Sequence, residues 1–165
     1  MYEVATRQMP RRRLLCLKRN VDESGLWAFG KEFIGIVRDQ RLPRLEGREG
    51  AVFCIYWGQV SADSDGPVEW CKPVPVSEAE GLAAQFPELT LRVERAHQEA
   101  FVKIGDGQID GADWQVVSRS LEAWSEQQPH ILPADLGLRI TYLPSEWGLG
   151  TYQDFAVPFS GLPRG

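Results

Sequence analysis

The residues whose types suggest chemistry lie in the stretch IYWGQVSADSDGPVEWCKPVP, residues 55–75. Glu69 stands between two large apolar residues in a strand-forming run, and the aromatic pair Tyr56 and Trp57 precedes it across a turn. Side chains alternate along a strand, so Glu69 shares a face with Cys71 and a proline, a poor setting for an exposed charge. A buried carboxylate must be paired, hydrogen-bonded or protonated. A cationic or hydrogen-bond-donating aromatic ligand would satisfy this carboxylate, and so would a nearby Lys or Arg at the rim of the sheet.

Which aromatic side chain lies beside Glu69 depends on the register of the hairpin. If Trp57 opposes Glu69, the two share a face, whereas a one-residue slip or a bulge at Gly58 brings Tyr56 there instead. The second half offers two tyrosines in its closing strands and a tryptophan between them, which is predicted as a pocket lid or as packing for the next strand. The candidate ligand-binding residues are therefore Tyr56, Trp57, Glu69, Tyr142, Trp147 and Tyr152.

Other chemistries are not supported by the sequence. The two histidines and three cysteines are not at metal-ligand spacing, and no nucleophile elbow or phosphate-binding loop is present. The segment GDGQIDG, residues 105–111, hints at a calcium loop, but Gln108 and Val117 stand where acidic ligands belong, so a loop with a helix cap is predicted. We expect no metal and no cofactor. Any catalysis would depend on carboxylates and phenols.

Composition describes an ordinary folded domain. The 165 residues suit a single domain spanning 1–165, and the net charge of −5 argues against direct nucleic-acid binding. No apolar window is long enough to span a membrane, and the N-terminus lacks a signal-peptide core. Three widely spaced cysteines in apolar runs predict reduced thiols and a cytoplasmic protein. Six tryptophans, a high share, suit a ligand pocket.

Hydrophobic periodicity predicts the order strand, helix, strand, strand twice over. Ser24 is a candidate cap for the first helix, whose interior glycines suit a close approach to a sheet. The predicted fold is α+β, with half-repeats of roughly 1–83 and 84–165, pseudo-two-fold symmetry, helices on one side of a curved antiparallel sheet and a ligand cleft between the halves. The predicted strands are 12–20, 51–60, 68–76, 89–96, 99–105, 136–144 and 151–159. The predicted helices are 25–40 and a second one that starts at Asp110 and Asp113, a pair resembling a capping box, and runs to about Gln128. The apolar stripe of this second helix is Trp114, Val117, Leu121 and Trp124.

This order of elements resembles the GyrI-like small-molecule-binding domain, the effector-binding domain of bacterial multidrug-sensing and AraC-type regulators. The resemblance is carried by RRLLCLKR, by IYWGQVSADSDGPVEWCKPVP, and by EAFVKIG, WQVVSRSLEAW and LGLRITYLP, over nearly the whole chain. It implies a cleft for bulky, flat, lipophilic and often cationic compounds, with Glu69 and Tyr142 as the matching positions. Many members have a Glu two residues before that Tyr, where this chain has Ile140.

Three functions are compatible with this resemblance. The leading prediction is a drug or metabolite sink or sensor that binds a lipophilic or aromatic small molecule, without a DNA-binding domain. The alternative, implied by free-standing members similar to hydrolases of cyclopropane-bearing genotoxic compounds, has Glu69 as general base and Tyr142 stabilising an oxyanion. The third is an inhibitor that binds a partner enzyme.

Overall fold

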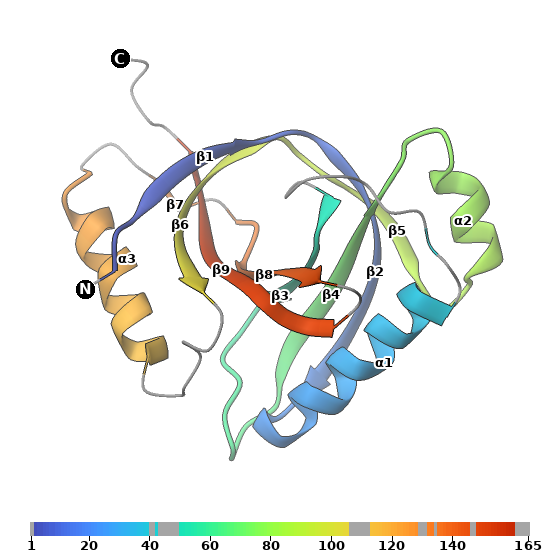
Figure 1. The fold of residues 1–165 in the computed structure, drawn as a ribbon, viewed down its shortest axis with the longest axis horizontal. Helices are drawn as coiled ribbons and strands as arrows, with labels where there is room; N and C mark the ends of the chain where they lie inside the picture. The colour runs from blue at the N-terminus through green and yellow to red at the C-terminus, as the bar shows by residue number, and fades with distance from the viewer. Residues whose placement is uncertain are drawn as a thin grey trace.

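The structure, a computed structural model, describes residues 2–39, 42, 50–105, 113–128, 132–133, 135–145 and 148–160. The described strands form one antiparallel sheet with helices beside it (Figure 1). The elements are β1 (Ala5–Met9), β2 (Arg12–Val21), the 3-10 turn η1 (Glu23–Gly25), α1 (Leu26–Asp39), β3 (Val52–Tyr56), β4 (Gly66–Val74), α2 (Ala79–Gln85), β5 (Thr90–Glu94), β6 (His97–Gly105), α3 (Asp113–Glu126), β7 (Leu132–Pro133), β8 (Leu138–Ser145) and β9 (Gly148–Ser160).

The sheet order shows the predicted duplication. The strands lie in the order β1-β6-β9-β8-β3-β4-β2-β5, with β7 paired to β9. Strands at equal distances from the two edges of the sheet are equivalent elements of the two halves, and β8 and β3 lie at the centre. Each edge strand pairs with a strand of the other half, because β1 pairs β6 and β5 pairs β2. The α+β fold with pseudo-two-fold symmetry is therefore confirmed. The predicted boundary at residue 83 falls within α2.

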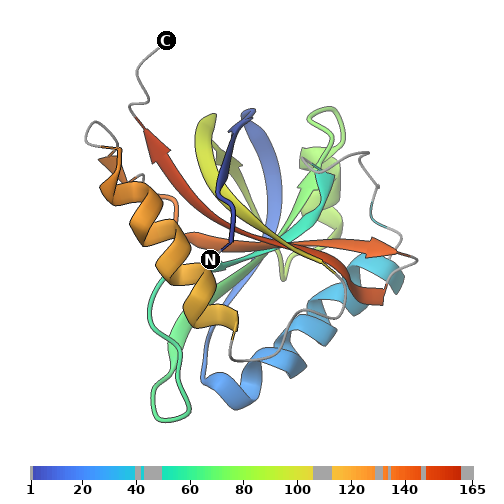
Figure 2. The same cartoon turned by 60° about the vertical axis from the view of Figure 1, so that its left-hand side comes forward.

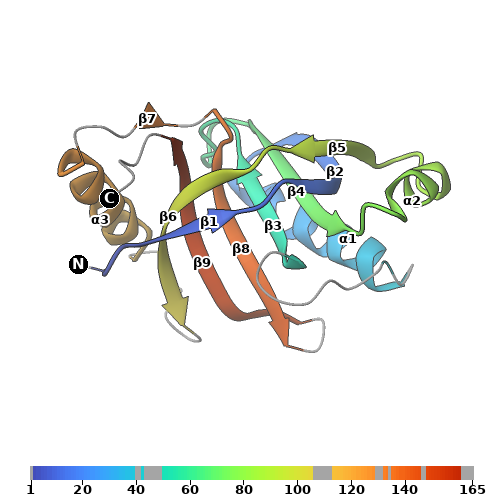
Figure 3. The same cartoon turned by 90° about the horizontal axis from the view of Figure 1, so that it is seen from above.

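One continuous ribbon arches over the sheet. The β1–β2 segment and the β5–β6 segment pair in the same register on both sides of a bend, with Ala5 opposite Phe101 and Arg12 opposite Glu94. Figures 1 and 3 show this ribbon passing over the central strands. The sheet thus curls into a half-barrel. We call the sheet face that carries the helices the helix face and the opposite one the inner face.

The first half packs α1 and α2 on the helix face. Alternation along β4 places Trp70 toward α1, where its ring stacks on Phe33 with centroids 6.0 Å apart. Gly30 faces that indole, and a Cβ at Gly30 would lie 2.9 Å from the Trp70 Cζ2 atom. The predicted close approach of helix and sheet is therefore confirmed at Gly30. Glycine is needed here because a larger residue would force the helix away from the tryptophan ring.

The second half packs α3 on the same face. Figure 2 shows α3 lying along the side of the sheet. The predicted apolar stripe is confirmed at Val117 and Leu121, which are buried against β6, β8 and β9. Trp124 ends the stripe half-buried, with its ring 5.5 Å from that of Phe159. Among the described helices, none combines the length and the apolarity needed to cross a membrane.

Local details differ from the sequence prediction in two places. The first helix is preceded by η1, whose N-cap is Asp22, so Ser24 lies within that turn and is not its cap. The Asp22 carboxylate accepts a hydrogen bond from the Gly25 backbone amide and another from the Ser24 hydroxyl. Strand β1 and helix α2 were not predicted, because β1 is short and polar and α2 has only seven residues. The predicted cap loop at 105–111 lies outside the described residues except for its first residue.

A buried ionic network lies on the inner face beneath the arch. Glu94 on β5 accepts hydrogen bonds from Arg12 on β2 and from Arg139 on β8. Glu99 on β6 accepts from Arg7 on β1. The network connects both edge strands to the centre of the sheet, so it stabilises the curled shape rather than either half alone. Further members are His97, which bonds Glu99, and Asp154, which accepts from Arg7.

Candidate functional site

The register of the central hairpin separates the predicted site residues. Ile55 pairs with Glu69, and Tyr56 pairs with Val68. Trp57 follows Ile55 by two positions, so its side chain lies on the same face of the sheet as Glu69. Tyr56 points to the other side and packs against the apolar clusters beneath α1 and α3. Of the two alternatives left open by the sequence, Trp57 is the aromatic residue beside Glu69. The indole Nε1 donates a hydrogen bond of 3.1 Å to the Glu69 carboxylate.

Glu69 has a second partner that the sequence did not identify. Arg92 on β5 donates from Nη2 to Oε1 at 2.7 Å and from Nε to Oε2 at 3.2 Å. The Glu69 side chain is 8% exposed and that of Arg92 26%. Burial by itself would lower the pKa of Arg92, but the hydrogen bonds to Glu69 and the nearby thiols outweigh it and raise that pKa. The sequence allowed either a bound ligand or a nearby Lys or Arg as the partner of Glu69. The structure shows that Arg92 is such a partner.

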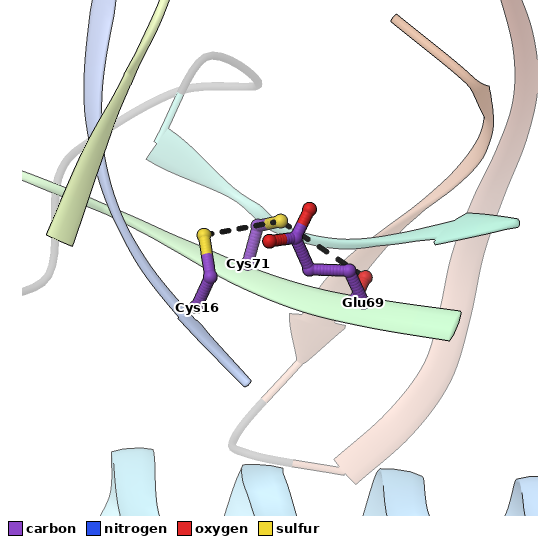
Figure 4. Close-up of side chains that lie close together, drawn as sticks. All are labelled: Cys16, Glu69 and Cys71. Atoms are coloured by element: carbon purple, nitrogen blue, oxygen red, sulfur yellow. Dashed lines mark hydrogen bonds between the residues drawn. The ribbon is translucent and has the colours of Figure 1, made fainter. Parts of the chain in front are cut away.

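Two thiols complete this inner-face cluster (Figure 4). Cys16 on β2 and Cys71 on β4 are direct cross-strand partners, and their sulfur atoms lie 3.5 Å apart. Both are buried and free. Burial in this apolar setting raises the pKa of the Cys71 thiol well above its usual value, and the neighbouring Cys16 adds to the effect. The ligand atoms of Cys16, Glu69 and Cys71 all lie within 4.8 Å of one another.

The other predicted residues are only partly described. The backbone of Tyr142 pairs with Val52, and that of Tyr152 pairs with Gly105, so both tyrosines lie on central strands of the sheet. Their side chains, and all of Trp147, lie outside the described residues. Tyr56 is the predicted site residue whose side chain the structure places on the helix face. Burial raises its pKa above the usual value.

A cavity lies between α3 and the sheet on the helix face. Its volume is about 450 Å³, within the usual range for small-molecule pockets of roughly 300–1,000 Å³. Two exposed acidic residues of α3, Glu122 and Glu126, belong to its lining. Leu138, which also lines it, is the cross-strand partner of Tyr56. The apolar part of the lining is Ala100, Leu121, Trp124, Leu138, Phe155, Val157, Pro158 and Phe159.

The sequence contained a signal for this cavity that the prediction did not use. Two glutamates flank Trp124 on the helix, two positions away on either side. Along β9, alternation places Phe155, Val157 and Phe159 on one face. An aromatic strand face opposite an aromatic helix residue with acidic neighbours has the composition of a binding pocket.

Comparison with known proteins supports the fold. No family model matches the chain, and no curated protein matches its sequence. Its structure superposes on the C-terminal domain of EcmrR with a TM-score of 0.69 at 16% identity, covering 98% of this chain and 99% of that one. It superposes on SAV2435 bound to tetraphenylphosphonium with a TM-score of 0.66 at 10% identity, covering 96% and 94%. A hydrolase from Listeria innocua gives 0.57 at 10% identity, covering 96% and 92%.

The described strands form a curled antiparallel sheet with helices on one face, which makes the fold an α+β half-barrel. Its particular form is the GyrI-like fold, as the likeness to EcmrR and SAV2435 shows. The predicted family resemblance is therefore confirmed at the level of the fold.

Proposed function

We propose that this protein binds bulky aromatic, lipophilic molecules in the cavity beneath α3, with a preference for cations. The observation that carries the proposal is the cavity itself, whose apolar wall includes Trp124, Phe155 and Phe159. Aromatic faces attract a cation that lies within about 6 Å of the ring centroid, by roughly 0.5–2 kcal/mol each. The carboxylates of Glu122 and Glu126 add a negative potential at the same lining. The likeness to a protein bound to tetraphenylphosphonium supports the same class of ligand.

The cavity is a better candidate than the surroundings of Glu69. The Glu69 carboxylate already receives three hydrogen bonds from Arg92 and Trp57, so its charge is compensated inside the protein. A cation arriving there would have to displace a guanidinium. The carboxylates of Glu122 and Glu126 are exposed and belong to the cavity lining. A ligand-binding role for Glu69 stays a prediction, and the same experiment tests it.

The test is a titration of the full chain with tetraphenylphosphonium, in which binding is measured by calorimetry and by the change in tryptophan fluorescence. Ser118→Trp should fill the cavity from α3 and abolish binding, while Arg119→Ala, one residue along but exposed, should leave it unchanged. Trp124→Ala should weaken binding by about tenfold, equal to 1.4 kcal/mol. Circular dichroism and the melting temperature of each variant confirm folding.

A second titration separates charge from shape. Replacing Glu122 and Glu126 by glutamine should weaken tetraphenylphosphonium binding and leave neutral triphenylphosphine oxide unaffected. Glu69→Gln should change neither. Binding lost in Glu69→Gln but retained in Ser118→Trp would place the ligand on the inner face and refute the cavity.

A hydrolase is the second candidate, because a similar structure is that of a hydrolase from Listeria innocua. The two cavity carboxylates offer a general base for water attack on a reactive lipophilic ring. Turnover of a cyclopropane-bearing alkylating compound, lost when both carboxylates become amides, would support it. Glu69 and Tyr142 stay predictions in this role, and single Glu69→Gln and Tyr142→Phe variants test them.

A further inference from the structure

The inner-face cluster has the donor set of a metal site. Cys16 and Cys71 face each other across β2 and β4, and Glu69 lies two residues before Cys71 on the same face. All three ligand atoms lie within 4.8 Å of one another, with the two sulfurs 3.5 Å apart (Figure 4). Both thiols are free, and all three side chains are buried.

The spacing suits tetrahedral zinc or cadmium. With Zn–S bonds of about 2.3 Å and Zn–O bonds of about 2.0 Å, tetrahedral angles put two sulfurs roughly 3.8 Å apart and a sulfur and an oxygen roughly 3.5 Å apart. The observed sulfur separation differs from this by a few tenths of an ångström. It is far from the ~2.05 Å of a disulfide. Two thiolates also exclude magnesium and calcium as the preferred ions, since those favour oxygen ligands.

The residues around Glu69 resemble the outer shell of such a site. A carboxylate has about four lone-pair positions. Trp57 and Arg92 fill three of them, which leaves one on Oε2 for a metal. Ligating carboxylates are generally oriented by hydrogen bonds of this kind.

Charge is also balanced in the loaded site. Two thiolates and a carboxylate carry three negative charges, and a divalent cation offsets two of them. Arg92 offsets the third, because its Nη2 lies 2.7 Å from the Glu69 carboxylate and 3.8 Å from the Cys71 sulfur. The buried cluster would therefore be neutral, which low-dielectric surroundings favour.

We propose that Cys16, Cys71 and Glu69 bind one thiophilic divalent cation, zinc or cadmium, with Arg92 and Trp57 as outer-shell residues. The site is on the face opposite the α3 cavity, so it is independent of the ligand-binding function proposed above. The two cysteines are 55 residues apart in the sequence. Zinc motifs are recognised by closely spaced ligands, so spacing rules did not predict this site.

The test uses the full chain, reduced with a phosphine and freed of metal by a chelator. Titration with cadmium should produce a thiolate-to-metal charge-transfer band that saturates at one equivalent. X-ray absorption of the zinc-loaded chain should show two sulfur neighbours at about 2.3 Å and oxygen neighbours at about 2.0 Å. This second measurement needs no variant and so does not depend on any substitution folding.

Variants assign the ligands. Cys16→Ser should lose the band, while Cys54→Ser is the matched control and should keep it, since Cys54 is equally buried but lies on the helix face. Glu69→Gln should weaken binding about tenfold or more, and Arg92→Gln by roughly 10–100-fold. The proposal is overturned by no stoichiometric band, by fewer than two sulfur neighbours, or by equal loss in Cys54→Ser.

Discussion

Replacing Glu94 by glutamine should destabilise the protein severely, because this carboxylate connects the arch to the centre of the sheet. Its side chain is 0% exposed and accepts hydrogen bonds of 2.6 Å from Arg12 and of 2.7 and 2.8 Å from Arg139, itself 1% exposed. Burial raises the pKa of Glu94, but the two guanidinium groups outweigh this and hold that pKa below its usual value. Glutamine keeps the shape and removes the charge, so two buried guanidinium groups would face a neutral amide.

The expected loss follows from that geometry. Removing one partner of a buried ion pair costs about 3–5 kcal/mol, because the remaining charge stays buried and loses that partner's compensation. For a chain of this size, each kcal/mol lowers the melting temperature by roughly 2–4 °C, so the loss corresponds to roughly 6–20 °C. The folded-state pKa of Glu94 is depressed, so its ionised carboxylate contributes fully to stability above the unfolded-state pKa. That contribution is lost as the pH falls from the unfolded-state pKa through the folded-state pKa.

Urea unfolding at pH 7, followed by circular dichroism, measures the change in the free energy of unfolding. The matched control is Glu80→Gln, which breaks an ion pair with Arg13 at 2.9 Å in which Glu80 is 81% exposed. Such surface pairs are worth about 0–1 kcal/mol. The difference between Glu94→Gln and the wild type should shrink as the pH is lowered into the acidic range. A loss for Glu94→Gln no larger than that of Glu80→Gln would refute the reasoning.

Two further predictions concern packing and acid stability. Gly30→Ala should lower the free energy of unfolding by about 1–3 kcal/mol, because the added Cβ would lie 2.9 Å from the Trp70 ring. Gly81→Ala is the control, since the space around Gly81 is open, and it should be stabilising in the same urea melts. Equal changes in the free energy of unfolding for the two variants would contradict the close packing at Gly30. Burial opposes ionisation of Glu99, but hydrogen bonding to His97 and the charges of two arginines lower its pKa from 4.5 to about 2. Its contribution of roughly 3 kcal/mol is therefore complete above about pH 4.5 and is lost toward pH 2, so wild type and Glu99→Gln should converge in acid urea melts; a constant gap would argue against it.

Much of the fold could be predicted from local periodicity. Alternation in β4 correctly separates Glu69 and Cys71 from Trp70, because successive side chains of a strand point to opposite faces whatever its partners are. The 3.6-residue stripe likewise identifies Val117 and Leu121 as the buried face of α3. Both rules depend only on near neighbours in the chain.

The candidate site could be predicted only in part, because its contacts are between distant residues. Register placed Trp57 rather than Tyr56 beside Glu69, and a one-residue slip would have reversed this. Arg92 reaches Glu69 because β5 pairs with β2 of the other half. No periodic pattern encodes that pairing.

The sequence by itself determined which residues share a face in the predicted strands and helices, and the order of two similar halves. The tertiary structure decided which faces meet: the exchange of edge strands, the curl stabilised by Glu94 and Arg139, the cavity beneath α3 and the meeting of Cys16 with Cys71. The physical reason is that side-chain direction follows from local backbone geometry, whereas partners follow from long-range pairing and from the curvature that burying charge and apolar surface imposes.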